Sequence, residues 1–313
     1  MFNVFISTLS PMLTMFTCII IGCILNKSKK VPENTAVVLS KCESYFILPT
    51  LSLSNFIKYC SVQSLKENYR LILYSAGILT LAMIIGTALS GLFSKDEYKR
   101  NIYKYSLTIA NFGFMGNAIV PMILGEETLY KYLLFTLPLN VAVYTWGIAI
   151  LTTKGEKKES PLKRIINPTS TAMTAGIIIG VLGIGKYLPK FFLSAISSIS
   201  ACMGPLAMVL TGFVIAQYDF LEMLKNRKVY VVTFLRLAVL PLIFVMILRF
   251  VGAEKEVILL TFIAFGTPLG LNTVVFPSVY GGDTKTGASM AMISHTLCVI
   301  TIPILYSFIC AIY

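Results

Sequence analysis

The second half of this chain repeats the first half about 156 residues later. Pro49 matches Pro205 at this offset, and Pro121 matches Pro277. The run Pro-Met-Ile-Leu-Gly-Glu-Glu-Thr that begins at Pro121 reappears at Pro277 as Pro-Ser-Val-Tyr-Gly-Gly-Asp-Thr. Because a nearly constant offset recurs at separate places, we interpret the chain as an internal duplication, which predicts two copies of one structural unit.

The solvent of this protein is a membrane rather than water. Of its 313 residues, 56% are apolar and only 13% are charged, and the mean hydropathy is +0.80. Soluble domains carry about 25% charged residues. Apolar stretches of roughly 20 residues recur, each long enough to cross a hydrocarbon core ~30 Å thick. The longest polar segment is 154–167, so we expect one membrane transport domain over 1–313.

Loops and helix breakers divide the chain into ten expected transmembrane helices. The loops after the odd-numbered helices carry more Lys and Arg than the others, which places them in the cytoplasm and both termini outside. Five helices per half is an odd number, so the repeats 1–153 and 168–313 would be inverted, joined by a cytoplasmic loop over 154–167. We therefore expect an all-α, multi-pass protein of the cell membrane. The expected helices are 5–25, 36–57, 69–93, 101–124, 128–153, 168–187, 191–218, 229–252, 256–280 and 285–312.

Several other classes of function are disfavoured by the composition. The net charge of +12 is spread through short loops, which fits the positive-inside bias and not a nucleic-acid partner. The seven cysteines show no C-x-x-C spacing, so we expect neither disulfides nor a metal site. One histidine and scattered acids do not supply an intramembrane catalytic group, so we expect no enzyme. The Gly176-x-x-x-Gly180 motif predicts close helix packing.

The fourth and ninth expected helices contain breakers near their middle. The first holds Asn111-Phe-Gly-Phe-Met-Gly-Asn-Ala118, and the second holds Gly266-Thr-Pro-Leu-Gly-Leu-Asn-Thr273. Gly and Pro weaken the helical hydrogen-bond ladder, and a released backbone group in hydrocarbon must find protein, water or a ligand. One interpretation is a pair of packing kinks. The other, favoured by the matched positions, is a shared midplane site where two half-helix N-termini attract an anion.

These motifs resemble the auxin efflux carrier family, which includes bacterial malate and malonate permeases and PIN-type carriers. The resemblance also rests on the Asn167-Pro168 opening of the sixth helix, on Gly204-Pro-Leu-Ala207, and on Pro268-x-x-x-Asn272 followed by Tyr-Gly-Gly-Asp283, and it covers nearly the full length. It implies the sodium/proton antiporter and bile acid symporter-like fold, with crossed, broken helices 4 and 9. It also implies a scaffold of helices 1, 2, 6 and 7, mobile helices 3–5 and 8–10, and a homodimer.

The resemblance implies substrate-binding roles for several residues. Asn111 matches an asparagine that contacts a substrate carboxylate, Pro268 matches the crossover proline, and Asn272 matches an asparagine of bacterial members. Where the family usually has a proline after Met-Gly of helix 4, this chain has Ala118. The candidate substrate-binding residues are Asn111, Gly113, Gly116, Asn117, Asn140, Pro268, Asn272 and Thr273; for Asn140 and Thr273, hydrogen bonding between helices is an equal alternative.

Three ionisable residues inside expected helices are candidates for coupling or for a charge partner. Arg236 would attract an anionic substrate, or its guanidinium would extend to the nearby cytoplasmic surface or cap carbonyl groups freed elsewhere. Glu43 could couple transport to protons, but we favour a structural role near Lys41 and the membrane surface. His295, the only histidine, could relay protons, although a hydrogen-bonded packing role is the more common one.

The sequence therefore predicts a secondary transporter for a small organic anion, such as malate, malonate or an aromatic weak acid, working by elevator-type alternating access. The alternative is a Na⁺- or H⁺-coupled inorganic-ion transporter or antiporter on the same fold. No acidic residue lies between Asn111 and Pro121 or between Gly266 and Pro277, which disfavours the alternative. No cofactor is expected, and coupling to H⁺ or Na⁺ is left open.

Overall fold

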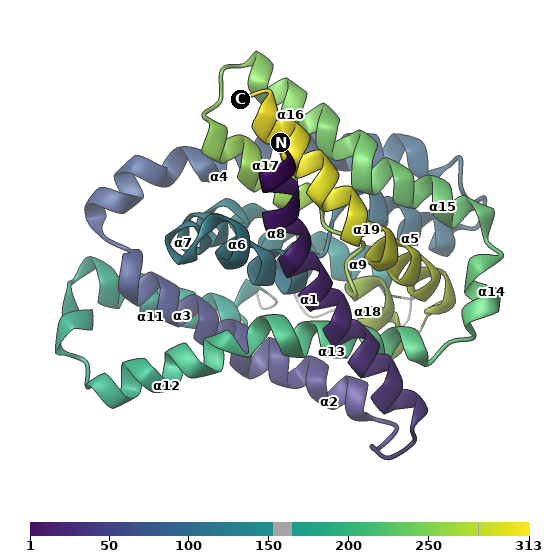
Figure 1. Cartoon of the computed structure of the whole chain (residues 1–313), viewed down its shortest axis with the longest axis horizontal. Helices are drawn as coiled ribbons and strands as arrows, with labels where there is room; N and C mark the ends of the chain where they lie inside the picture. The colour runs from purple at the N-terminus through teal and green to yellow at the C-terminus, as the bar shows by residue number, and fades with distance from the viewer. Residues whose placement is uncertain (153–164, 281) are drawn as a thin grey trace.

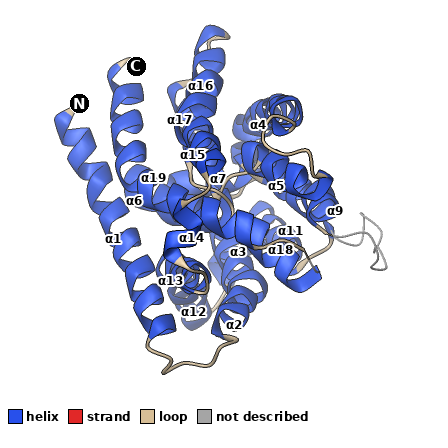
Figure 2. Cartoon of the chain, turned by 90° about the vertical axis from the view of Figure 1, so that its right-hand side faces the viewer, coloured by secondary structure: helices blue, strands red, loops and turns tan. Residues whose placement is uncertain are grey.

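A computed structural model describes residues 1–152, 165–280 and 282–313, and every regular element in these ranges is helical (Figures 1 and 2). Of the loop expected over 154–167, residues 154–164 lie outside the described residues. The elements of the first half are α1 Phe2–Lys27, α2 Thr35–Cys42, η1 Glu43–Ile47, α3 Leu48–Tyr59, α4 Val62–Ser90, α5 Glu97–Thr108, η2 Phe112–Gly116, α6 Asn117–Leu124, α7 Glu126–Phe135, α8 Leu137–Ala142, η3 Val143–Gly147 and α9 Ile148–Leu151.

The second half follows with a similar order of elements. They are α11 Pro168–Val181, η4 Ile184–Tyr187, α12 Lys190–Ala201, α13 Met203–Ala216, α14 Phe220–Leu224, α15 Arg227–Phe234, η5 Leu235–Val239, α16 Leu240–Phe250, α17 Lys255–Gly266, α18 Asn272–Tyr280 and α19 Lys285–Ala311. The elements η1, η2, η3 and η5 are single π-helical turns, which insert one extra residue into a helix and often mark functional positions.

Six helices of the described chain are long and apolar enough to cross a membrane, and a seventh is counted when α7 and α8–α9, bent by 48°, are taken as one span. The protein is therefore an all-helical, multi-pass membrane protein. The expected helices 101–124 and 256–280 fall short of the length of a span because each is interrupted: α5 ends at Thr108 and α17 ends at Gly266. The expected helix 168–187 is shorter than predicted, with α11 ending at Val181.

Helix ends are satisfied by the side chains that the sequence provides there. Ser61 accepts a hydrogen bond from the backbone N–H of Ser64 at the start of α4, and Asp96 does the same for Lys99 at the start of α5. Asn167 and Ser170 form a reciprocal capping box at the start of α11, and Pro168 occupies its first turn. Such caps pair backbone donors that would otherwise lack an acceptor.

Glycines let the helices approach closely. Gly22 of α1 and Gly212 of α13 face each other, and a side chain on either would collide with the backbone of the other helix. Gly176 and Gly180 of α11 lie against α3, where an added Cβ on Gly180 would stand 2.5 Å from the Phe56 carbonyl oxygen. The close packing predicted from the Gly-x-x-x-Gly motif is therefore confirmed. All seven cysteines are free, as expected.

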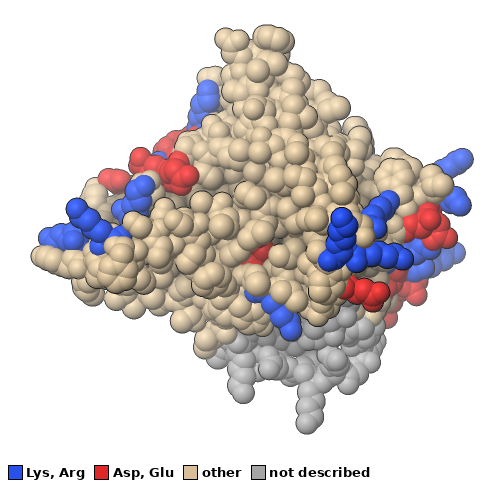
Figure 3. All heavy atoms as spheres, turned by 60° about the horizontal axis from the view of Figure 1, so that its bottom comes forward, with Lys and Arg blue, Asp and Glu red and all other residues tan. Residues whose placement is uncertain are grey.

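The two termini lie at the same end of the molecule, with α1 and α19 side by side (Figures 1 and 2). On the face shown in Figure 3, most charged side chains gather at the left and right margins, and the surface between them is largely uncharged. Large apolar side chains such as Leu73, Phe234 and Ile300 are more than half exposed, as expected for a protein surrounded by lipid.

Candidate functional site

The interruptions of the fourth and ninth expected helices meet each other. Ala110 pairs with Leu269 in an antiparallel bridge, and the backbone N–H of Asn111 donates to the Pro268 carbonyl oxygen over 2.8 Å. The chain is non-helical between α5 and η2 and again between α17 and α18. Some of the backbone groups that lose their helical hydrogen bonds in one break therefore pair with backbone groups of the other break. The structure therefore brings the two predicted breaks together.

The first break is shaped by Asn111 and the glycines after it. The carbonyl oxygen of Asn111 accepts from the backbone N–H groups of Met115 and Gly116, at 3.1 and 3.0 Å, which closes the π-helical turn η2. The Tyr132 hydroxyl donates to the Phe112 carbonyl oxygen over 3.2 Å and occupies the space that a Cβ on Gly116 would need. The fourth expected helix, 101–124, is thus interrupted although Ala118 stands where the family usually has a proline.

The second break is held by contacts to both sides. Asn272 begins α18 and donates from Nδ2 to the Tyr105 hydroxyl oxygen of α5 over 2.9 Å. The Thr273 hydroxyl donates to the Gly270 carbonyl oxygen over 3.1 Å. A Cβ on Gly270 would stand 3.2 Å from the Ala110 carbonyl oxygen, so glycine permits the close approach of the two chains.

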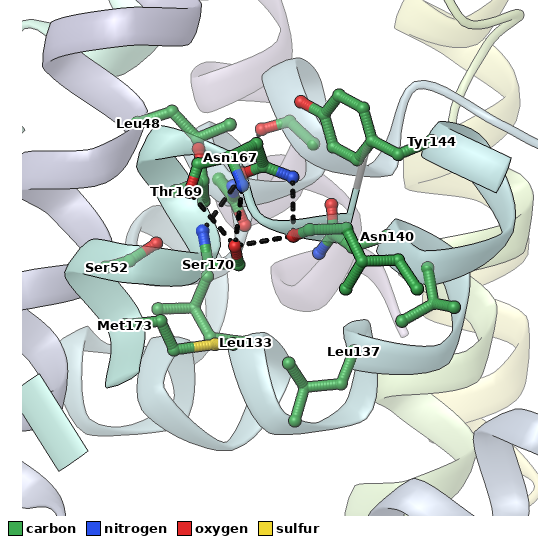
Figure 4. A pocket seen from close by; sticks show the side chains of 14 residues that line it. Leu48, Ser52, Leu133, Leu137, Asn140, Tyr144, Asn167, Thr169, Ser170 and Met173 are labelled. Carbon is green, nitrogen blue, oxygen red and sulfur yellow. Dashed lines mark hydrogen bonds between the residues drawn. The ribbon is translucent and has the colours of Figure 1, made fainter. Parts of the chain in front are cut away.

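A cavity of about 120 Å³ adjoins the first break (Figure 4). It is lined by residues of α3 and of α11 with the segment before it, and by residues of η2, α6, α7, α8 and η3. Figure 4 shows Asn167, Thr169 and Ser170 close together on one side of the cavity, whereas Met173, Leu133 and Leu137 line another. The full lining is Leu48, Ser52, Gly113, Asn117, Leu133, Leu137, Asn140, Val141, Tyr144, Ile165, Asn167, Thr169, Ser170 and Met173.

Only three of the eight predicted substrate-binding residues line this cavity: Gly113, Asn117 and Asn140. The amide Nδ2 of Asn117 donates to the Gly113 carbonyl oxygen over 2.7 Å, and that of Asn140 donates to the Thr136 carbonyl oxygen over 3.2 Å. Asn117 is 4% exposed, and its Oδ1 has no hydrogen-bond partner among the described residues. The cavity lining does not include Asn111, Gly116, Pro268, Asn272 or Thr273. These residues lie in or next to the two paired breaks, around Ala110–Asn111 and Pro268–Leu269, which we call the crossing.

The polar side of the cavity contains residues that sequence reasoning did not propose as contacts. Thr169 places a buried hydroxyl there that has no partner among the described residues, and Ser52 and Tyr144 add further hydroxyl groups to the lining. The Asn167-Pro168 pair was a visible helix-start signature. However, nothing in the sequence indicated that the start of α11 would lie beside the break between α5 and η2. These two segments are far apart in the chain, and residue patterns do not predict such contacts.

Two helix N-termini meet at this cavity. Gly113 lies in the first turn of the half-helix Phe112–Leu124, and Thr169 lies in the first turn of α11. Within the described chain, neither backbone N–H has a hydrogen-bond acceptor. Helix N-termini carry unpaired donors and a partial positive charge, which together favour an anion.

The three ionisable candidates lie outside the cavity lining. Arg236 is 1% exposed and donates from Nη1 to the Leu107 carbonyl oxygen over 3.4 Å. That carbonyl belongs to the last turn of α5, where unpaired oxygens and the helix dipole attract a cation. Nη1 of Arg236 therefore caps a carbonyl group at the end of α5, whereas Nε and Nη2 have no hydrogen-bond partner within the described chain. Attraction of an anion by Arg236 stays a prediction.

The side chain of Glu43 is completely buried, and both carboxyl oxygens lack a hydrogen-bond partner within the described chain, so no ion pair with Lys41 is present there. The reason is that residues two apart on a helix point to different faces. Lys41 is exposed, whereas Glu43 turns inward at the π-helical turn η1.

His295 is 1% exposed and lies on α19 beside the crossing. Its Nε2 is 3.1 Å from Nδ2 of Asn111, and its Nδ1 is 2.7 Å from the carbonyl oxygen of Ala291. The hydrogen-bonded packing role that we considered the more common one is present. Among the described residues, no three His, Cys, Asp or Glu side chains cluster as they would around a metal ion.

Comparison with known proteins gives the family. The model of the family described as "Membrane transport protein" matches residues 7–306, nearly the whole chain. No curated protein matches the chain. With crossed helix breaks and a family match over almost its full length, the chain belongs to the membrane transport protein family, that of the auxin efflux carriers and PIN-type proteins, and it is a membrane transporter.

Proposed function

We propose that this protein is a secondary transporter that carries a small organic anion by elevator-type alternating access. The observation that carries the proposal is the crossing of two interrupted helices, where the Asn111 N–H pairs with the Pro268 carbonyl beside a cavity with two helix N-termini. Broken helices that point their N-termini at a midplane site are a common way in which transporters bind anions. Of the two N-termini at this cavity, one is that of the interrupted helix Phe112–Leu124 and the other is that of α11.

The cavity composition suits a carboxylate with an apolar body. The first turns of the half-helix and of α11 provide backbone donors, and Thr169, Ser52 and Tyr144 provide hydroxyl groups. Leucine, valine, isoleucine and methionine side chains form the apolar part of the wall, and further asparagine and serine side chains complete the lining. A substrate carboxylate that fills the cavity would accept a hydrogen bond from the buried Thr169 hydroxyl, which otherwise remains unpaired. The buried Asn117 Oδ1 is an acceptor, so it would pair with a hydroxyl group of the substrate, such as that of malate.

The architecture supports a moving site. The cavity lies between α3 and α11, which belong to the expected scaffold, and η2, α7, α8 and η3, which belong to the expected mobile group. Elements also recur at similar offsets in the two halves: α5 and α17 each have 12 residues and each precede a break. We infer ten membrane segments in two inverted repeats, with both termini outside and the loop 154–167 in the cytoplasm. A homodimer in the cell membrane stays a prediction of the resemblance.

The direct test is uptake into proteoliposomes of radiolabelled malonate, malate, benzoate and indole-3-acetate, with Na⁺ and pH gradients also tested without any organic anion. We expect saturable uptake of at least one anion. Ion flux in the absence of every organic anion would instead identify an inorganic-ion transporter. A thermal-shift screen against the same anions provides a binding readout, since a ligand of the folded state raises the unfolding temperature.

Two variants test the position of the site. Thr169→Val removes a hydroxyl donor from the cavity, and we expect about tenfold weaker binding of the transported anion, since one hydrogen bond contributes about 1–1.5 kcal/mol. Asn117→Ala removes an acceptor, so we expect the same loss for an anion that carries a hydroxyl group, such as malate. Asn55→Ala is the matched control, because Asn55 is also buried and also donates to a carbonyl four residues earlier, Leu51, but does not line the cavity. Unchanged binding in both cavity variants would remove this cavity as the site.

A further inference from the structure

The last helix, α19, contacts both interrupted helices through two adjacent side chains. Ser294 accepts a hydrogen bond on Oγ from the backbone N–H of Leu269 over 3.1 Å. The next residue, His295, contacts the side chain of Asn111. Leu269 and Asn111 stand on opposite sides of the pairing between the two breaks, so α19 touches each of the two interrupted helices at its break.

A single backbone carbonyl orients both side chains. The Ala291 oxygen lies 3.2 Å from Ser294 Oγ and 2.7 Å from His295 Nδ1. A carbonyl oxygen can only accept hydrogen bonds, so the serine hydroxyl donates to it and the ring nitrogen Nδ1 carries a proton. The serine oxygen is then free to accept from Leu269, as observed.

The same carbonyl determines how Asn111 is oriented. With a proton on Nδ1, the neutral imidazole has an unprotonated Nε2, which is an acceptor. Only the amide nitrogen of Asn111 can donate to it, and Nδ2 is the atom found 3.1 Å away. The side-chain nitrogen of Asn111 therefore faces α19, and its oxygen faces the opposite direction.

Because these groups are buried, only one orientation of the Asn111 amide satisfies its hydrogen bond to His295. Asn111, Ser294 and His295 are 2%, 1% and 1% exposed, so water does not compete for these groups. Turning the Asn111 amide around would place its oxygen against the lone pair of Nε2, leaving two buried acceptors face to face. Asn111 is also held by its backbone, through Pro268 on one side and Met115 and Gly116 on the other.

We propose that Ser294 and His295 are positioning residues that hold the two broken helices in register, with His295 in its Nδ1–H form setting the orientation of the Asn111 amide. Asn111 then stabilises the crossing by bonding to α19 through its side chain and to Pro268 through its backbone. Its side chain is committed to α19 in this conformation, and the substrate meets the neighbouring Gly113 and Asn117. The consequence for transport rests on the proposed function, whereas the hydrogen-bond geometry does not.

The chain contains one histidine, so selective ¹⁵N-histidine labelling of the full-length protein, purified without a histidine tag, reports on one residue. We expect the NMR signature of the Nδ1–H tautomer with a hydrogen-bonded Nε2. Asn111→Ala should shift the Nε2 resonance. Thr296→Val should leave it in place, because the Thr296 hydroxyl bonds only within its own helix, to Met292. An Nε2–H tautomer, or an Nε2 signal indifferent to Asn111→Ala, overturns the proposal.

Uptake measurements then separate positioning from other roles. Glutamine can place a side-chain oxygen where His295 has Nε2, because both atoms are four bonds from Cα, so His295→Gln should keep at least half of the wild-type uptake of the transported anion. His295→Ala should lose about tenfold, and Thr296→Val should lose none. Equal losses in the Gln and Ala variants, or no loss in His295→Ala, contradict the proposal. If the wild type transports none of the four anions, the proposed function fails while the NMR result still decides the geometry.

Discussion

At the scale of single residues, the buried polar groups divide into those that hold the crossing and those that remain unpaired. His295, the half-buried Asn272 and Nη1 of Arg236 have partners on other helices. Nε and Nη2 of Arg236 have none within the described chain. Glu43, Thr169 and the Asn117 oxygen lack partners in the described part of the chain. An unpaired buried polar group is costly, so it indicates either a ligand or a role in the transport cycle.

Glu43 gives a prediction at this scale. A fully buried carboxyl group without a hydrogen bond is destabilising when it is ionised. Glu43→Gln keeps its shape and removes the charge, so we expect an unfolding temperature in detergent, at neutral pH, equal to or a few degrees above that of the wild type. Glu222→Gln, at an exposed ion pair with Lys285, is the control and should change it little. A clear loss of stability in Glu43→Gln would indicate a partner for the carboxylate that this conformation does not have.

At the scale of elements, helix contacts depend on small residues at defined positions. The α3–α11 contact, which forms one side of the cavity, relies on Gly176 and Gly180. Because lipid tails are as apolar as leucine, tight contact between backbones provides much of the attraction between membrane helices. The rigidity of the part of the cavity wall formed by α3 and α11 therefore depends on how tightly these two helices pack.

Gly180→Ala tests that contact. Its Cβ would stand 2.5 Å from the Phe56 carbonyl oxygen and 2.7 Å from that of Cys60, and backbone atoms cannot move aside easily. We expect a loss of about 1–3 kcal/mol of stability, seen as a lower unfolding temperature. Gly77→Ala, in α4, has no atom within 4 Å of the added Cβ and should be neutral or slightly stabilising. If the two variants have the same unfolding temperature, the α3–α11 contact is looser than described.

At the scale of the whole molecule, the position of the termini constrains the topology. The two termini lie at the same end of the molecule in both ribbon views (Figures 1 and 2). An even number of crossings returns a chain to the side from which it started. The distribution of Lys and Arg then determines which side that is.

Reporter fusions test this topology. Alkaline phosphatase is active only outside the cytoplasm, so we expect activity when it is fused after Tyr313. A fusion within the loop 154–167 should be inactive there, whereas green fluorescent protein at the same site should fluoresce. Opposite results at the two sites are required by an odd number of crossings in each half. The same reporter response at both sites would contradict the inverted repeats.

Sequence patterns alone predict the class of protein, the bounds of most helices and the places where two of them break. These properties follow from local chemistry: apolar length, caps such as Asn167, and breakers such as Gly113 and Pro268 act within a few residues of their position. The family could be recognised from the same motifs.

The contacts of the polar residues became visible only in the folded molecule. Asn111 and Asn117 stand six positions apart in one broken helix, yet one bonds to His295, 184 residues away, and the other lines a cavity shared with α11. Glu43 and Lys41 are neighbours in sequence but face opposite environments. Partners of this kind are set by how distant helices pack, and hydropathy and residue spacing carry no information about contacts between segments far apart in the chain.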